Sequence, residues 1–505
     1  MVLDPQPGVL NFRMHLHQID LVIIAAYLIA ITLFGLRFRK SQRSLRDYFL
    51  ADRNIPWWAI ALSIVAAETS TLTVIGTPGI AYGGNFGFLQ LVLGYLAGRV
   101  VISLIFIPQY FRGEMFTAYQ LIDRRFGKAL HRITSAVFLL TRAAAEGVRV
   151  WAVAIVVRVA LGTNDIGSVA IVVALTLIYT FEGGMAAVIW TDVVQMLIYV
   201  GGTIAGFLTL THLVPGGWPA IHQAAASAGK LRVFDFSFTF FKTYTFWAGV
   251  IGGMFLTTAS HGTDQLMVQR LLSARNQRDS RVALLSSGVV ILVQFTLFLL
   301  VGAGLWYFYR LNPPTGFPTP DYVFPRFIVD HMPVGMSGLL IAAIFAAAMS
   351  NLSAALNSLS SATIVDFYLR LRPETPESRQ LGLSRTATIV WGIVLFALAL
   401  AARQSHGVLE TGLSIASVAY GGLLGVFLLG LLTRRATQAG AIAGMLCGLA
   451  LNGYLWKGTH IAWTWYVTFG ATATFVVGYL MSLVITYAKR RKLDASNRTK
   501  TGTIA

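Results

Sequence analysis

The sequence predicts an all-α polytopic membrane protein, and two observations carry that prediction. Of its 505 residues, 56% are hydrophobic and only 12% are charged, whereas a soluble protein carries about 25% charged residues. Apolar runs long enough to cross a bilayer as helices recur from one end of the chain to the other. We expect about thirteen transmembrane helices, at roughly residues 18–36, 56–82, 85–110, 131–160, 166–182, 185–212, 244–268, 282–308, 334–364, 384–402, 408–432, 437–456 and 461–487.

The basic residues indicate how these helices are oriented. A net charge of +18 could suggest a nucleic-acid partner, but most Lys and Arg residues fall in alternate loops. Clusters such as Arg37–Lys40, Arg124–Arg125 and Lys489–Lys492 then share one side of the membrane. By the positive-inside rule, we expect an outside N-terminus and a cytoplasmic C-terminus in the plasma membrane. We expect the basic surface to contact the lipid bilayer, and we expect no nucleic-acid partner.

Motifs for enzymatic chemistry are missing from the sequence. The single cysteine, Cys447, excludes a disulfide framework and a multi-thiolate metal site. The sequence has no phosphate-binding G-x-x-x-x-G-K-[ST] loop and no H-E-x-x-H zinc motif. We interpret the intramembrane His261 as a hydrogen-bonded packing residue. We therefore expect that the protein is not an enzyme.

Two predicted spans are interrupted by polar and helix-breaking residues. In the second span, Ala66–Gly79 contains Glu68, several hydroxyl residues, Gly76 and Pro78, so we expect an unwound turn there. Thr257–Asp264 interrupts the seventh span in a comparable way. Broken helices at matching places in two halves of a chain point to a transporter site. Two ordinary kinked helices are the alternative.

The ninth span is rich in oxygen-bearing side chains. Its small and polar residues recur at helical spacing, so several share one face. In lipid such groups need partners inside the protein, and a monovalent cation is one partner that accepts only oxygens. Close helix packing is the alternative. The residues on this face are Ala347, Ser350, Asn351, Ser353, Asn357 and Ser358.

Several motifs, taken together and in order, resemble the sodium:solute symporter family. Thr69–Tyr82 resembles the family's broken first core helix, Gly183–Gln195 its fifth, and Asp264–Arg270 the end of its sixth. The resemblance implies a LeuT-type fold with two inverted five-helix repeats. We expect these repeats at 56–212 and 244–432, joined by an extracellular loop at 213–243. An extra helix and basic loop (1–55) precede them, and two extra helices (433–492) and a disordered tail (493–505) follow. A further signature comprises Gly430, Arg435, Gly440, Ala441, Gly444 and Gly448.

The resemblance implies one sodium site between the broken helix and the ninth span. Its ligands would be backbone carbonyls of Ala66, Thr69 and Ala347, the Ser350 hydroxyl and the Asn351 amide oxygen. The family usually has a hydroxyl at the position of Asn351, so this ligand would reach the ion on a longer arm. Sodium is the expected coupling ion.

Two alternatives to a single sodium ion remain. Asp192 and Ser353 match the second sodium site of some family members, although Ala354 lacks the expected hydroxyl and Asp192 could equally be a structural acceptor. A proton-coupled version would need a titratable group, and Glu68 is one.

Candidate solute contacts follow from the same resemblance. Ile291 stands where sugar transporters have a lysine, and Ala145 where sialic-acid transporters have an arginine. Arg142, Glu146 and Arg149 share one face of the fourth span, where Arg would suit a carboxylate. An internal salt bridge is the alternative. The full set of candidates is Ser70, Thr73, Gln90, Arg142, Glu146, Arg149 and Ser260.

The function expected from these features is sodium-coupled symport of a small organic solute by alternating access. A carboxylate-bearing solute (an organic anion, sialic acid or amino acid) is favoured. A symporter of sugars or other neutral solutes, a passive channel and a membrane solute sensor are the alternatives. The oligomeric state is open.

Overall fold

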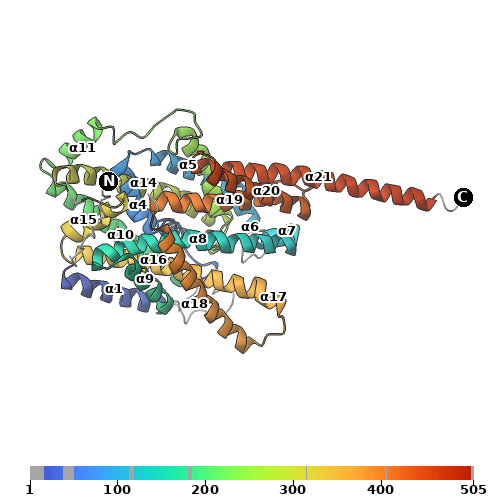
Figure 1. Ribbon diagram of the computed structural model, residues 1–505, viewed down its shortest axis with the longest axis horizontal. Helices are drawn as coiled ribbons and strands as arrows, with labels where there is room; N and C mark the ends of the chain where they lie inside the picture. Colours follow the sequence, from blue (N-terminus) through green and yellow to red (C-terminus); the bar gives the residue numbers. More distant parts are fainter. Residues whose placement is uncertain are drawn as a thin grey trace, which may run out of the picture.

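The structure is a computed structural model, and it describes residues 16–37, 51–112, 119–179, 185–313, 316–404 and 407–501. Within these ranges the chain is helical and forms no β-sheet, only one isolated bridge between Ile55 and Ala274. Most of the long helices run along the long axis of the molecule (Figure 1).

The described residues contain twenty α-helices and six 3₁₀ or π segments. The helices of the first half are α1 (Gln18–Leu36), α3 (Trp57–Glu68), α4 (Thr71–Gly83), α5 (Phe88–Val101), α6 (Ile107–Tyr110), α7 (Tyr119–Phe126), α8 (Lys128–Leu161), α9 (Asp165–Tyr179), α10 (Met185–Leu213) and α11 (Gly217–Ser227). Those of the second half are α12 (Gly253–Gly262), α13 (Gln265–Leu272), α14 (Gln277–Leu311), α15 (Val323–His331), α16 (Met336–Ser361), α17 (Leu369–Leu371), α18 (Glu377–Ala402), α19 (Val408–Leu432), α20 (Gln438–Gly458) and α21 (Tyr466–Thr501). The 3₁₀ or π segments are η2 (Ala51–Arg53), η3 (Ile102–Phe106), η4 (Ala248–Gly252), η5 (Pro320–Tyr322), η6 (Ala362–Tyr368) and η7 (Trp463–Trp465).

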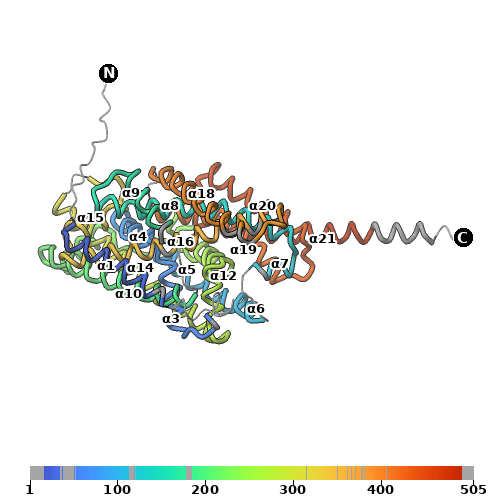
Figure 2. Tube along the Cα trace, turned by 90° about the horizontal axis from the view of Figure 1, so that it is seen from below, coloured from blue at the N-terminus to red at the C-terminus, as the bar shows by residue number. Residues whose placement is uncertain are grey.

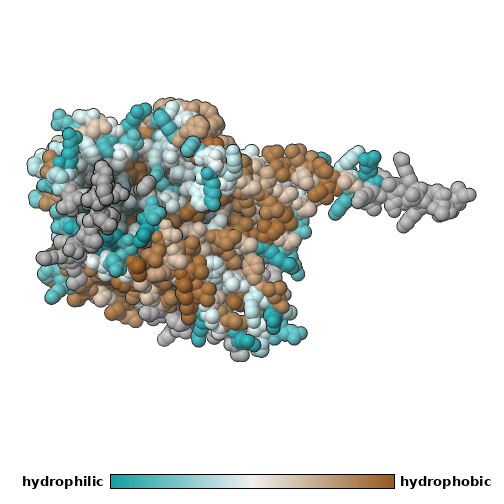
Figure 3. All heavy atoms as spheres, viewed as in Figure 1, coloured by the Kyte–Doolittle hydropathy of each residue, from teal (hydrophilic) through white to brown (hydrophobic). Residues whose placement is uncertain are grey.

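Length and apolar composition identify the membrane-crossing helices. Among the described residues, 8 helices are long and apolar enough to cross a membrane, or up to 10 if each of two sharply bent helix pairs is one span. Hydrophobic side chains cover the middle of the molecule, and hydrophilic ones gather toward its ends (Figure 3). The prediction of an all-α polytopic membrane protein is therefore confirmed.

The break in the second predicted span lies between α3 and α4. The two helices meet at an angle of 65°, and Thr69 and Ser70 form the turn between them. The expectation that Gly76 and Pro78 lie in the unwound turn was wrong, because both lie inside α4. Gly76 instead permits close packing, since a Cβ at this position would lie 2.7 Å from the Cβ of Leu409.

The break in the seventh predicted span lies between α12 and α13. The predicted interruption, Thr257–Asp264, remains helical as far as Gly262. The chain then turns at Thr263, and the Asp264 side chain caps α13 by accepting a hydrogen bond from the Leu266 N–H at 2.9 Å. A carboxylate at a helix N-terminus satisfies backbone donors that would otherwise be unpaired.

Glycines set the spacing of the core helices. A Cβ on Gly94 of α5 would collide with the Gly249 carbonyl of η4, and one on Gly444 of α20 with the Thr474 carbonyl of α21. Such close backbone approach is how membrane helices pack when lipid offers no hydrophobic drive between them. The tube in Figure 2 shows α4, α5, α12 and α16 in the middle of the molecule, where α5 packs on α12 and α16 contacts α4 and α8.

The C-terminal end of the chain differs from the prediction. Helix α21 continues to Thr501 and projects well beyond the bundle (Figure 1). The expected disordered tail was therefore wrong for residues 493–501, whereas 502–505 lie outside the described residues. Parts of two predicted motifs, residues 38–40 and 183–184, also lie outside them.

Candidate solute and cation site

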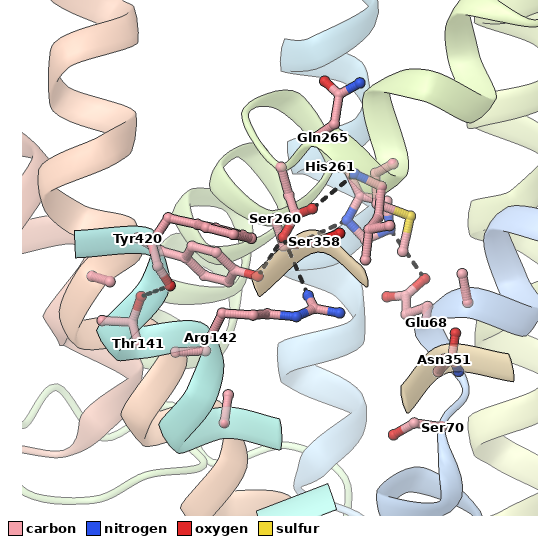
Figure 4. A pocket seen from close by; sticks show the side chains of 18 of the residues that line it. Glu68, Ser70, Thr141, Arg142, Ser260, His261, Gln265, Asn351, Ser358 and Tyr420 are labelled. Atoms are coloured by element: carbon pink, nitrogen blue, oxygen red, sulfur yellow. Dashed lines mark hydrogen bonds and ion pairs between the residues drawn. The ribbon is translucent and has the colours of Figure 1, made fainter. Parts of the chain in front are cut away.

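A cavity of about 710 Å³ lies where the broken helices meet α5, α8, α16 and α19. Glu68 and Ser70 reach it from the α3–α4 break, and Asn351 reaches it from α16. Figure 4 shows these side chains facing Ser260 and Arg142 across the same space. A single cavity therefore joins both broken helices and the oxygen-rich ninth span.

The α3–α4 break leaves backbone oxygens without their helical partners. The N–H of Ser70 donates to the Glu68 carbonyl at 3.1 Å, and not to Ala66 as a continuous helix would require. Among the described residues, no backbone N–H donates to the carbonyl of Ala66 or of Thr69. Both residues are buried. Unpaired carbonyls at such depth call for a bound partner or water.

The other three predicted sodium ligands lie on α16. Ala347 is buried, and Asn351 lines both the main cavity and a small neighbouring one of about 20 Å³. Ser350 precedes Asn351 on the helix. Helix α16 contacts α4, so these positions lie on the element that packs against the broken helix.

At the predicted second sodium site, the Asp192 side chain is hydrogen-bonded to other described residues, whereas the Ser353 side chain is not. Asp192 Oδ2 accepts hydrogen bonds from Ser63 Oγ at 2.6 Å and from Arg270 Nη2 at 2.9 Å. The Ser353 hydroxyl is buried and has no hydrogen-bond partner among the described residues. The contacts of Asp192 thus tie α10 to α3 and α13. The assignment of Asp192 and Ser353 to a sodium ion stays a prediction.

The charged residues of α8 form an internal network that also borders the cavity. Glu146 Oε1 lies 2.9 Å from Arg142 Nη2 and 3.0 Å from Arg149 Nη1. Arg142 Nη1 is 3.8 Å from Asp264 Oδ2, to which the Tyr420 hydroxyl donates at 3.3 Å. Both arginines line the main cavity, whereas Glu146 lines the small one. The salt bridge and a cavity-facing guanidinium therefore coexist.

The remaining predicted solute contacts divide into two groups. Ser70, Thr73 and Ser260 line the cavity. Gln90 does not line it. The Gln90 amide instead donates to the Tyr244 carbonyl at 3.3 Å and accepts from the Asp235 N–H at 2.9 Å, so it holds the 228–247 segment against α5.

The sequence did not predict that two cavity residues and a buried arginine interact with one another. Glu68 and His261 line the cavity, 3.4 Å apart between Glu68 Oε2 and His261 Nε2. Behind them, the buried Arg99 of α5 pairs with the same Glu68 oxygen. The available signal was an arginine in the third predicted span, since an intramembrane charge needs a partner of opposite sign.

Comparisons with known proteins agree with these features. A model of the sodium:solute symporter family matches residues 48–448. The chain is 28% identical over 504 residues to the sodium/sialic acid symporter SiaT of Proteus mirabilis (strain HI4320), an alignment covering 96% of this chain and 99% of the relative. It is 27% identical over 439 residues to the human sodium-coupled monocarboxylate transporter 2, covering 85% of this chain and 70% of the relative.

Solved structures show the same architecture. A Na⁺-coupled sialic acid symporter in a substrate-bound outward-open state matches with a TM-score of 0.81 and 27% identity, covering 92% of this chain and 98% of that one. A nucleobase-cation-symport-1 family transporter in a closed conformation shares the fold, with a TM-score of 0.56 and 15% identity, covering 87% and 94%. Because the family model spans most of the sequence, the chain belongs to the sodium:solute symporter family.

Proposed function

We propose that this protein is a sodium-coupled secondary active symporter that imports a small, carboxylate-bearing organic solute by alternating access. The observation that carries the proposal is the α3–α4 break. Its unpaired carbonyls belong to Ala66 and Thr69, and the adjacent Ser70 lines the cavity. A cation bound to these carbonyls would hold the same short segment that the solute contacts.

The sodium site is proposed to comprise the carbonyls of Ala66, Thr69 and Ala347, the Ser350 hydroxyl and the Asn351 amide oxygen. Neutral oxygens suit an unhydrated monovalent cation. Glu68, the titratable group that a proton-coupled version would use, already pairs with Arg99, which favours sodium as the coupling ion. The family and its relatives are named for sodium coupling.

The solute site is proposed to use Arg142 for the carboxylate, with Ser70, Thr73 and Ser260 as polar contacts. The Arg142 Nε is buried without a hydrogen-bond partner among the described residues, and the Arg142 side chain lines the cavity. Planar guanidinium groups bind carboxylates in two-pronged fashion. Glu146 and Arg149 would position Arg142. Sialic acids and monocarboxylates, which the relatives are named for, all carry this group.

The finer topology is also part of the proposal. We place thirteen transmembrane helices in two inverted repeats, 56–212 and 244–432, with the N-terminus outside and the C-terminus cytoplasmic in the plasma membrane. The two broken helices, α3–α4 and α12–α13, are the first helices of the two repeats, as an inverted-repeat transporter requires.

The conformation fits an inward-facing state. The cavity reaches Tyr119, the first residue of the basic helix α7, and His131 in the first turn of α8. At the other end α4 is closed against its neighbours, because a Cβ on Gly79 would lie 3.0 Å from the Pro320 carbonyl. Alternating access would open this second end and close the first.

Uptake into proteoliposomes tests the proposal. A labelled panel of amino acids, sialic acids, monocarboxylates and sugars is offered with an inward sodium gradient or with choline. We expect one carboxylate-bearing class to accumulate above equilibrium in sodium only. Equilibration without sodium would indicate a channel, and binding without flux a sensor. Calorimetry should show tighter solute binding in sodium, with coupling of about 5–150-fold.

A further inference from the structure

Four polar side chains connect the protein interior to the wall of the solute cavity. Arg99, which is 1% exposed, pairs with Glu68 Oε2 and donates from Nε to Ser287 Oγ at 3.1 Å. The same Glu68 oxygen faces His261 Nε2 at 3.4 Å. On its other side, His261 Nδ1 lies 2.8 Å from Ser260 Oγ. Figure 4 shows the Glu68–His261–Ser260 part of this chain beside the cavity.

The charges of this chain determine the proton arrangement on His261. His261 Nε2 faces the Glu68 carboxylate, so a ring hydrogen on Nε2 points at the negative charge, whereas a lone pair there would be repelled by it. From this geometry we place the ring hydrogen on Nε2, the nitrogen that faces the carboxylate. Nδ1 is then an acceptor.

The Ser260 hydroxyl therefore donates its hydrogen inward. Its nearest acceptor is His261 Nδ1 at 2.8 Å, and the only other one in reach among the described residues is the Thr257 carbonyl at 3.5 Å. Both acceptors belong to α12. Because Ser260 lines the cavity, its oxygen lone pairs are what it offers to a solute. A hydroxyl whose hydrogen is taken acts only as an acceptor.

We propose that Ser260 makes the site select carboxylates that also carry a hydrogen-bond donor, such as a hydroxyl, amide N–H or ammonium group, over plain carboxylates. This inference rests on the proposed function, in which Arg142 takes the carboxylate, and it narrows the solute class. A solute without the donor would displace water from the Ser260 oxygen and leave that oxygen unpaired. Sites built to hydrogen-bond a solute group reject analogues that lack it.

Matched pairs of acids, titrated by calorimetry against the full-length protein in sodium buffer, test this selectivity. The pairs are lactate and propionate, 3-hydroxybutyrate and butyrate, N-acetylglycine and 4-oxopentanoate, and proline and cyclopentanecarboxylate. The first member of each pair supplies a donor that the second lacks. In at least one pair we expect the donor-bearing acid to bind about tenfold more tightly, as one hydrogen bond permits.

Two variants assign the effect to Ser260. Ser260→Ala should reduce the ratio within a pair to near one by weakening the donor-bearing acid. Ser358→Ala is the matched control, since Ser358 also lines the cavity but lies two helical turns beyond Asn351 on α16 and donates to its own Ala354 carbonyl at 2.8 Å. The control should keep the ratio.

Equal binding within every pair, binding of none of these acids, or a ratio that survives Ser260→Ala would overturn the inference. The proposed function fails separately, through the absence of sodium-driven accumulation of any solute in the proteoliposome panel. Sodium-driven uptake of plain and donor-bearing carboxylates at equal affinity would support the symporter proposal and contradict the proposed selectivity.

Discussion

Gln294 of α14 donates a hydrogen bond from Nε2 to the Thr69 hydroxyl at 2.9 Å, across the α3–α4 break. Both side chains are buried. The hydrogen bond fixes the turn whose carbonyls are proposed to bind sodium, although Gln294 itself is far from Thr69 in the sequence.

Gln294→Ala should therefore weaken sodium binding without changing which solutes are accepted. The loss of one buried hydrogen bond costs about 1–3 kcal/mol when the partner stays unpaired. Part of this cost would make the turn between α3 and α4 less ordered. The sodium concentration for half-maximal uptake should rise several-fold. An unchanged sodium response together with altered solute preference would contradict this role.

Ser350→Ala tests the ion site from the α16 side. Removal of one of about five oxygens around a buried cation should again raise the half-maximal sodium concentration at least several-fold, by analogy with an unmade buried hydrogen bond. Ser350→Thr keeps a hydroxyl and serves as the control. If Ser350→Ala and Ser350→Thr respond to sodium alike, Ser350 is not a ligand.

Arg142→Lys distinguishes solute binding from internal bracing. Lysine keeps the charge beside Glu146 but loses the planar fork that suits a carboxylate. We expect sodium-driven uptake to fall while folded protein still reaches the membrane, and solute should no longer raise the thermal stability of the variant. If solute protects the variant as well as it protects the parent protein, Arg142 only braces Glu146.

Asp192→Asn tests whether the second sodium site exists. Because Asp192 pairs with the buried Arg270, removal of its charge should destabilise the protein by up to about 3–5 kcal/mol. The sodium Hill coefficient should stay the same if Asp192 binds no ion. A Hill coefficient that falls from near two to near one in Asp192→Asn would instead support the second site.

External pH should act on the closed end of the transporter through Asp321, which lies in η5 between α14 and α15. Burial raises the pKa of the Asp321 carboxyl to about 6, opposed by the Val408 N–H and the Thr319 hydroxyl and assisted by the negative charge of Glu410. Opening would hydrate Asp321 and return its pKa to about 3.9. Protonation therefore favours the closed end, and a fall from pH 7 to pH 5 outside should slow solute entry.

Asp321→Asn removes the titrating group and supplies the test of that pH dependence. Uptake measured between pH 5 and pH 7, with internal pH held constant, should lose most of its pH dependence in this variant. An identical pH profile in the variant would assign the dependence to another group.

The sequence by itself determined the membrane class, the approximate helix positions and the two broken helices. These follow from local properties: apolar length, polar residues in a span, and the family motifs around Thr69 and Asp264. The position of the first break required the structure. The sequence suggested Gly76 and Pro78 as the helix breakers, but the turn falls at Thr69 and Ser70. Gly76 lies inside α4, where its missing Cβ allows close packing against Leu409.

The partners that polar side chains find on other helices were decided only by the tertiary structure. Arg99, Glu68 and His261 meet although they lie in three different spans, and Asp192 finds Arg270 from another helix. Gln90 turns toward the 228–247 segment and not into the cavity. Helical spacing tells which residues share a face of one helix, but helix packing determines what that face meets, because a charge buried in a membrane needs a partner and the neighbouring helices decide which partners are within reach.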